Sequence, residues 1–313
     1  MTRYHFRFRD VPGRGSPQKY WHYLWGYLLP TISFLIDKEA SERHVPPPIF
    51  ESYGPLMDGV LADYMSILAL DYRMAAPHEN LASSQYMERF VPRWDVLQFS
   101  MAWPYLRELP ISPAPSRQER WRNGIQVLRQ RKLDALTSGM KGRRLLRRIE
   151  ALKRFILHAL SENEPADSTG SPYLVIDRSS APAAQHDPNC RFVQEYGTAT
   201  KSLRGVARTV AKLKDLGFNV ERFEPGAVGQ IEQITRFSNA RGVIAIRGSD
   251  LANILWLKPG SKLIVIRPQK KLSTHLYGMA DLLRLDFHEL GSNSPHPNLG
   301  EFPIERYLEN PSL

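Results

Sequence analysis

Residues 242–268 read GVIAIRGSDLANILWLKPGSKLIVIRP, and this stretch decides the fold class of the chain. Two short apolar runs rich in β-branched residues, 242–246 and 262–266, are typical of buried strands. Between them, residues 251–257 have the length of a short helix and are followed by a Pro-Gly turn at 259–260. A strand, a helix and a second strand in this order predict a parallel α/β unit.

The same alternation occurs upstream of this stretch. We predict strands at 173–176 and 218–223 and helices at 198–216 and 228–240. The first of these helices carries its apolar residues on one face, namely Leu203, Val206, Val210 and Leu213, with Gly217 just past its end. The pattern predicts a doubly wound parallel sheet, and ligands of such sheets bind at the carboxyl ends of the strands.

The turn after the run at 242–246 is the strongest candidate for a ligand site. It reads Arg247, Gly248, Ser249 and Asp250, and the predicted helix begins directly after it. Free backbone N–H groups at a helix start can bind an anion, and a glycine lets the backbone approach it closely. The alternative is an ordinary turn in which Ser249 or Asp250 only caps the helix.

The length and the linker composition predict two domains. At 313 residues, the chain is longer than one ordinary domain of about 100–200 residues. The segment SENEPADSTGSP is polar and has no apolar periodicity, which is typical of an exposed linker. We predict a first domain at 1–116, basic helices at 117–160, a linker at 161–172, a second domain at 173–290 and a tail at 291–313.

The basic residues are concentrated between positions 117 and 154. This stretch holds 13 Lys or Arg against three acidic residues, which gives +10, the net charge of the whole chain. Apolar residues recur in it at helical spacing, so we predict two amphipathic helices separated near residues 138–139. The apolar residues are Trp121, Ile125, Leu128, Leu133, Leu145, Leu146, Ile149, Leu152, Phe155 and Ile156.

Three interpretations of this basic stretch remain open. It is either a solvated helix face, or a surface that attracts the anionic lipid of a membrane, or a nucleic-acid-binding surface. Nucleic acid is disfavoured, because no nucleic-acid-binding motif is recognisable and the aromatic residues fall on the apolar stripe.

Two observations favour a cytoplasmic location. Cys190 is the one cysteine of the chain, so no intrachain disulfide can form, and the first residues lack the apolar core of a signal peptide. The apolar run at 20–36 contains Pro30 and is shorter than a bilayer requires, so we predict a buried helix with a proline break. With the basic stretch, this predicts a peripheral position on the inner face of a membrane.

Residues 230–268 resemble the hallmark segment of glycosyltransferase family 61. The residues in register are Gln233, Phe237, Ala240, Gly248, Leu251, Asn253, Pro259 and Gly260. Two further segments are similar to family motifs, namely 175–178 followed by 191–195, and the aromatic-His-aromatic run at 20–24 with Leu29-Pro30. The chain departs from the family at Arg247, where the family has histidine, and at Ser249-Asp250, where it has Ala-Gly.

The resemblance implies a GT-B fold, in which two Rossmann-like domains with parallel sheets face a central cleft. It implies that 1–116 is the N-terminal acceptor-side domain and that 173–290 is the C-terminal nucleotide-sugar-binding domain. It implies an inverting, metal-independent hexosyl- or pentosyltransferase that moves a sugar from a nucleotide-sugar donor to a glycan or lipid-linked acceptor in polysaccharide or glycoconjugate biosynthesis. We therefore expect no cofactor and no metal. A degenerate protein that binds nucleotide or glycan without turnover, and a basic adaptor for membrane or nucleic acid, are the alternatives.

The resemblance and the sequence pattern together give a set of candidate site residues. The donor-binding candidates are Arg178, Arg191, Arg247, Gly248, Ser249, Leu251, Asn253, His275 and Tyr277. Arginine suits the leaving diphosphate, because its planar guanidinium pairs with phosphate oxygens. The candidates for the general base are His22, Glu195 and Asp250, with Asp37 a weaker one. A carboxylate at 250 repels phosphate unless it caps the helix, pairs with Arg247 or accepts a proton.

Overall fold

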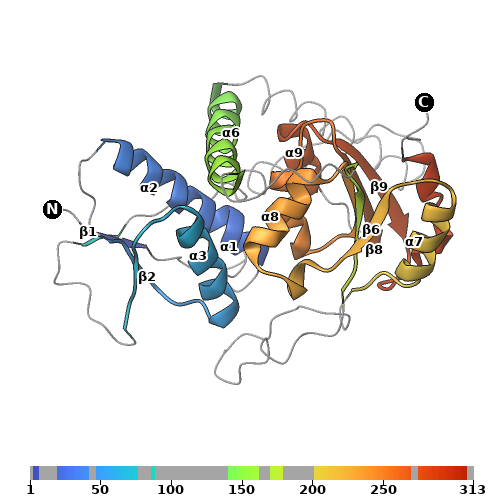
Figure 1. Cartoon of the computed structure of the whole chain (residues 1–313), viewed down its shortest axis with the longest axis horizontal. Helices are drawn as coiled ribbons and strands as arrows, with labels where there is room; N and C mark the ends of the chain where they lie inside the picture. The colour runs from blue at the N-terminus through green and yellow to red at the C-terminus, as the bar shows by residue number, and fades with distance from the viewer. Residues whose placement is uncertain are drawn as a thin grey trace, which may run out of the picture.

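The computed structural model contains two parallel β-sheets with helices packed around and between them (Figure 1). It describes residues 3–6, 20–41, 47–76, 86–88, 140–161, 170–178, 201–268 and 274–308. The predicted α/β class with parallel sheets is therefore confirmed.

The second sheet holds five parallel strands in the order β6-β5-β7-β8-β9. The strands are β5 (Tyr173–Ile176), β6 (Val220–Phe223), β7 (Gly242–Ile246), β8 (Lys262–Pro268) and β9 (Asp286–Ser292). The first four match the predicted strands to within two residues. The edge strand β9 was not predicted, because its sequence DFHELGS lacks the apolar run of a buried strand.

The two faces of this sheet belong to different cores. Leu174, Val243, Ala245, Leu263 and Val265 contribute to a large core that also contains residues of the N-terminal half. The alternate residues of the same strands, such as Val175, Ile244 and Ile264, pack into a smaller core with α7 (Val206–Asp215). We call the face in the large core the inner face.

Helix α7 begins later than the predicted start at 198. Gly205 precedes it with a φ of 68°, and Arg204 pairs with Asn298 in an isolated bridge, so the described residues before 206 are not helical. The predicted face is correct, since Leu203, Val206, Val210 and Leu213 are all buried. Part of the predicted tail packs over this face as well, through Leu299, Ile304 and Leu308. Leu299 and Ile304 begin the short 3₁₀ turns Leu299–Glu301 and Ile304–Arg306, and Leu308 follows the second turn.

The inner face is covered by α8 (Gln230–Asn239), the 3₁₀ helix η5 (Ser249–Trp256) and α9 (Thr274–Leu282). A short 3₁₀ turn, Pro225–Ala227, leads into α8. The helix predicted at 251–257 is thus present, although it is wound more tightly than an α-helix.

The first sheet holds four short parallel strands in the order β3-β2-β1-β4. They are β1 (Arg3–Phe6), β2 (Ile49–Phe50), β3 (Arg73–Met74) and β4 (Tyr86–Glu88). Helix α3 (Pro55–Ile67) connects β2 to β3.

The apolar run at 20–36 forms one continuous helical segment. It consists of α1 (Tyr20–Tyr23), the π-helical turn η1 (Leu24–Leu28) and α2 (Leu29–Ser41). The predicted proline break is a π turn instead of an interruption. Pro30 has no N–H to donate to a carbonyl four residues back, and the turn before it is wider, with the Leu29 N–H donating to the Leu24 carbonyl.

Helix α6 (Met140–Ser161) is the second of the two predicted basic helices, and the first lies outside the described residues. Ile149, Leu152 and Ile156 are buried and Arg147 and Arg154 are exposed, as the helical period predicts. The prediction was wrong for Phe155, whose side chain is exposed at 46 % relative accessibility. Phe155 directly precedes Ile156 and therefore lies beside the buried stripe.

Among the described residues, no helix has both the length and the apolar character needed to cross a membrane.

The two halves of the chain share one hydrophobic core. Helices α1, α3 and α8 lie between the two sheets (Figure 1), and Trp25 donates from Nε1 to the Ala252 carbonyl at 3.0 Å. Asp63 on α3 accepts a hydrogen bond from the Gln230 N–H at 2.8 Å and so caps α8 from the other half. The open central cleft of a GT-B fold stays a prediction.

Candidate functional site

The carboxyl ends of β5 and β7 bring together the residues that the sequence singled out. These strands are neighbours in the sheet, so Arg178, two residues after β5, lies close to the 247–250 turn that follows β7. This is the edge at which parallel α/β sheets bind their ligands.

Arg178 and Asp250 form a buried ion pair at this edge. Arg178 Nε lies 2.5 Å from Asp250 Oδ2, and the two side chains are only 7 % and 8 % exposed. The alternative that Asp250 caps the helix is not what the structure shows, because η5 has no side-chain cap and the carboxylate pairs with Arg178 instead. A buried pair of this kind compensates two charges that would each be costly alone.

Gly248 is required by the space that Arg178 occupies. A Cβ at Gly248 would lie 2.7 Å from Arg178 Cζ and 3.0 Å from Nη1. The Gly248 backbone is extended, with a φ of −172°, so its conformation alone does not demand glycine. The guanidinium therefore lies directly against the backbone of the turn. Ser249 is half-buried at the first residue of η5.

Arg247 is half-buried beside a second pair of charges. Burial lowers the pKa of its guanidinium, with the positive charge of Arg267 acting in the same direction and the negative charge of Glu289 opposing it. Arg267 Nε lies 3.6 Å from Glu289 Oε2, and the side chains are 18 % and 11 % exposed.

A chain of hydrogen bonds anchors η5 to α8 and α1. The Asn253 amide donates to Gln233 Oε1 at 2.7 Å, and Gln233 donates to the Val228 carbonyl at 3.1 Å. This order leaves Asn253 Oδ1 to accept from the Tyr20 hydroxyl at 2.9 Å, and the same hydroxyl lies 2.7 Å from the Gln230 side-chain amide. Burial raises the pKa of the Tyr20 hydroxyl far above its ordinary value, which keeps it protonated.

Two of the candidate donor-binding side chains lie inside the protein. The side chains of Leu251 and Asn253 are both fully buried. Leu251 packs in the shared core, and Asn253 is occupied by Tyr20 and Gln233. Neither side chain is exposed for a donor contact in this conformation.

The remaining candidates are placed only in part. His22 is half-buried on α1, two residues after Tyr20. Arg191 and Glu195 lie outside the described residues, and so do the side chains of His275 and Tyr277 on α9 and of Asp37 on α2. Within the described parts of the chain, no three His, Cys, Asp or Glu side chains gather as metal ligands would.

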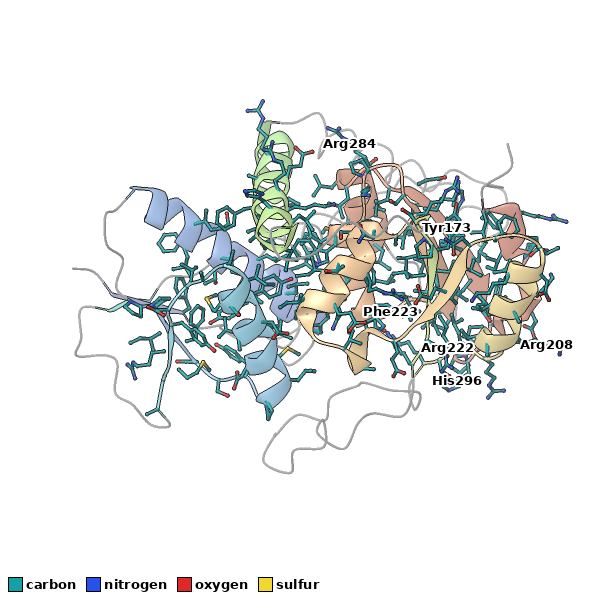
Figure 2. All side chains as sticks on the ribbon, viewed as in Figure 1. Tyr173, Arg208, Arg222, Phe223, Arg284 and His296 are labelled. Atoms are coloured by element: carbon teal, nitrogen blue, oxygen red, sulfur yellow. The ribbon has the colours of Figure 1, made fainter. Side chains whose placement is uncertain are left out.

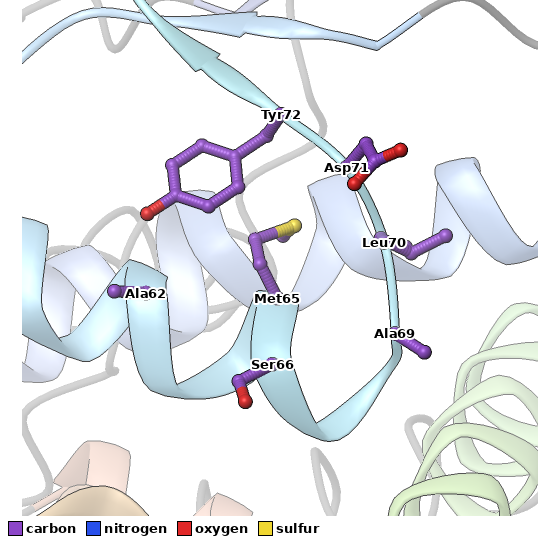
Figure 3. A pocket seen from close by; sticks show the side chains of 7 residues that line it. All are labelled: Ala62, Met65, Ser66, Ala69, Leu70, Asp71 and Tyr72. Carbon is purple, nitrogen blue, oxygen red and sulfur yellow. The ribbon is translucent and has the colours of Figure 1, made fainter.

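A surface hollow of about 530 Å³ lies elsewhere, between the end of α3 and the start of β3 (Figure 3). It is lined by Ala62, Met65, Ser66, Ala69, Leu70, Asp71 and Tyr72. A helix that leads into a parallel strand ends at the amino edge of the sheet, so the hollow lies at the edge opposite to the one that binds ligands in such sheets.

Several site residues escaped the sequence analysis. Tyr20 and Gln230 look like ordinary helix residues until the fold brings together positions 210 residues apart. Arg267 directly follows an apolar run that we interpreted as a buried strand, and Glu289 lies on β9, which was not predicted. The sequence marks this ion pair only through Arg267, a charged residue directly after the apolar run in KLIVIRP.

No curated protein gives a significant match to the chain. The family model described as Glycosyltransferase 61 matches residues 20–264, which is well over half of the chain and runs from Tyr20 through the 247–250 turn to β8. The chain belongs to glycosyltransferase family 61.

Proposed function

We propose that this chain is an inverting, metal-independent glycosyltransferase that uses a nucleotide-sugar donor. Membership of the family supports glycosyl transfer in general. The observation that carries the finer proposal is the placement of Arg178 and Arg247 at the carboxyl ends of adjacent strands, beside a glycine turn. This arrangement suits the diphosphate of a donor without requiring a metal ion.

The proposed reaction is a single displacement at the anomeric carbon. The acceptor hydroxyl oxygen forms the new bond to that carbon, and the bond from the carbon to the diphosphate oxygen breaks. The nucleoside diphosphate leaves with the bonding electron pair, and its developing charge is stabilised by arginines and by the N–H groups at the start of η5.

The acceptor proton passes to a general base. His22 is our first candidate, because it lies on α1, whose Tyr20 touches η5, and because an imidazole nitrogen can accept a proton. Asp250 suits the role less well, since accepting a proton would break its buried pair with Arg178. Glu195 remains a candidate from the sequence alone.

The acceptor in this proposal is a glycan or a lipid-linked glycan in polysaccharide or glycoconjugate biosynthesis. The exposed Arg147 and Arg154 on α6 support a cytoplasmic protein that binds the inner face of an anionic membrane peripherally. A hexose or a pentose fits the proposal equally.

The Arg178–Asp250 pair favours a second candidate function. Because Asp250 already neutralises Arg178, a protein that binds nucleotide or glycan without turnover would be built in the same way. In that case the departures from the family at positions 247, 249 and 250 would have removed catalysis and kept binding.

Release of nucleoside diphosphate separates the two candidates. The purified chain is incubated with a panel of nucleotide sugars and candidate acceptors in excess EDTA, and the released nucleoside diphosphate is measured. We expect acceptor-dependent release that survives the chelator. Binding of a nucleotide sugar without release would support the second candidate, and activity that requires added Mn²⁺ or Mg²⁺ would contradict the proposed mechanism.

A further inference from the structure

Arg267 belongs to a row of arginines on one face of the second sheet. Every second residue of a strand faces the same side of the sheet. Ile176 on β5, Ala245 on β7 and Val265 on β8 belong to the large core. Arg178, Arg247 and Arg267 each come two residues later, so they continue the same face. The three strands are consecutive in the sheet, in the order β5-β7-β8. Arg178 and Arg247 come after the ends of their strands, and Arg267 is the last residue but one of β8, so all three lie at the carboxyl edge.

The spacing of the row fits an extended anion. Neighbouring strands lie roughly 4.8 Å apart, so the three arginines span about 10 Å along the edge. A diphosphate with a sugar attached at one end can bridge such a distance. Arg178 lies against Gly248, the residue after Arg247. Arg267 follows Ile266, which pairs with Ile246 across the strands, so it lies beside Arg247 on the side away from Arg178.

The charges around Arg267 favour an anionic ligand. Arg247 and Arg267 are close enough for their positive charges to act on each other, and the carboxylate of Glu289 acts on Arg247 as well. Both guanidiniums are positively charged and lie at the edge where parallel α/β sheets bind their ligands, so an anionic ligand suits this edge.

Packing holds the Arg267 side chain in place. Glu289 lies two residues before Gly291, the residue that pairs with Arg267 across the strands. A Cβ at Gly291 would come within 3.0 Å of Arg267 Nη2, so the guanidinium lies over this glycine much as that of Arg178 lies over Gly248. The same device therefore positions the first and the last arginine of the row.

We propose that Arg267 is a third diphosphate-binding arginine of this site, beside Arg178 and Arg247. The inference rests on the proposed function, since it assigns Arg267 to the donor of the same reaction. Because Arg267 reaches further along the edge than Arg247, it contacts the end of the diphosphate that Arg178 does not reach.

The test is a calorimetric titration of Arg267→Met and Arg267→Lys with a panel of nucleoside diphosphates and the matching nucleosides. In Arg267→Met we expect the diphosphate affinity to fall about tenfold to a hundredfold and the nucleoside affinity to stay unchanged. Arg267→Lys should recover part of the loss, because lysine keeps the charge without the fork.

Arg284→Met is the matched control. Arg284 is exposed and lies in the connection that enters β9, at the amino edge of the sheet. Figure 2 shows Arg284 at the opposite end of the strands from Arg222, which lies in the carboxyl half of β6. Arg284→Met removes the same charge as Arg267→Met and should leave the diphosphate affinity unchanged. An unchanged diphosphate affinity in a folded Arg267→Met, or an equal loss for nucleoside and diphosphate, would overturn the inference. If the unaltered protein binds no nucleoside diphosphate, the proposed function itself fails.

Discussion

Arg178 and Asp250 lie 72 residues apart in the sequence and form an ion pair of 2.5 Å that is almost entirely buried. The pair joins the end of β5 to the start of η5. Asp250 is the anion that pairs with Arg178 in the structure, whereas the proposed function requires Arg178 to bind the diphosphate of the donor. Asp250 and the donor therefore compete for one guanidinium. The state of this pair is therefore central to whether the site binds a donor.

Replacing Asp250 by alanine should separate stability from binding. The change leaves a buried guanidinium without its carboxylate, so we expect the free energy of unfolding to fall by about 3–5 kcal/mol. Nucleoside diphosphate should bind the folded variant more tightly than the unaltered protein, because Arg178 no longer has a competing partner. Urea unfolding and calorimetry measure the two effects.

Glu305→Ala is the matched control for Asp250→Ala. Glu305 pairs with Lys212 at 3.5 Å on the surface, where an ion pair contributes at most about 1 kcal/mol. Weaker nucleoside-diphosphate binding in a folded Asp250→Ala would mean that Asp250 itself holds the ligand, against the competition described above.

Gly248→Ala tests whether the guanidinium of Arg178 must lie against the turn. The added methyl would overlap Arg178, so we expect the free energy of unfolding to fall by about 1–3 kcal/mol and nucleoside-diphosphate binding to weaken at least tenfold. Gly59→Ala on α3 is the control, since a Cβ there meets nothing within 4 Å and should stabilise the helix by about 0.5–1 kcal/mol. Equal behaviour of the two variants would remove the steric argument.

The pH dependence of stability should carry a contribution from Lys153. This side chain on α6 donates to the Leu257 carbonyl, and burial lowers its pKa to about 8 from 10.5. Between these two values the unfolded chain binds more protons than the folded one, so stability from this group rises as the pH increases from about 8 to about 10. The slope is at most about 1.4 kcal/mol per pH unit.

Lys153→Met should remove that part of the slope. Unfolding by urea at several pH values from 7 to 10 measures it, with the exposed Lys214→Met on α7 as the control that keeps the slope. An identical pH dependence in Lys153→Met and the unaltered protein would show that the lysine is not buried in solution as the structure has it.

The basic surface of α6 predicts salt-sensitive membrane binding. The protein should co-sediment with liposomes that contain anionic lipid at low salt, and about 0.5 M salt should release it, because exposed charges are screened over a few ångströms. Changing Arg143, Arg144, Arg147 and Arg148 together to glutamine should reduce the binding. Equal sedimentation with neutral liposomes, or no effect of salt, would favour a merely solvated helix face.

Much of the second half of the fold could be predicted from local sequence. Strands β7 and β8 are apolar runs bounded by turn residues, so their ends are marked in the sequence itself. Strand β9 was missed because an edge strand needs no continuous apolar run, and the start of α7 because Gly205 and the pairing of Arg204 with Asn298 override the helical pattern. Non-local contacts determine both features.

The candidate site was predictable only where the relevant residues lie in one segment. The 247–250 turn follows from a strand that runs directly into a helix, whereas the partner of Asp250 depends on which strand lies beside β7. Tyr20 and Asn253 are 233 residues apart in the sequence, and no local pattern marks a tyrosine on an aromatic helix as a polar anchor. Arg267 could be recognised as a candidate site residue only from the strand order, which places it in line with Arg178 and Arg247.

Calorimetric titration of the unaltered protein and of Arg247→Met with nucleoside diphosphates in excess EDTA tests the central claim most directly. The claim is that the carboxyl edge of the second sheet binds the diphosphate of a donor without a metal. We predict one site per chain for at least one nucleoside diphosphate, binding that EDTA does not change, and an affinity about tenfold to a hundredfold lower in Arg247→Met. No binding of any nucleoside diphosphate, binding that EDTA abolishes, or an unchanged affinity in a folded Arg247→Met would contradict it.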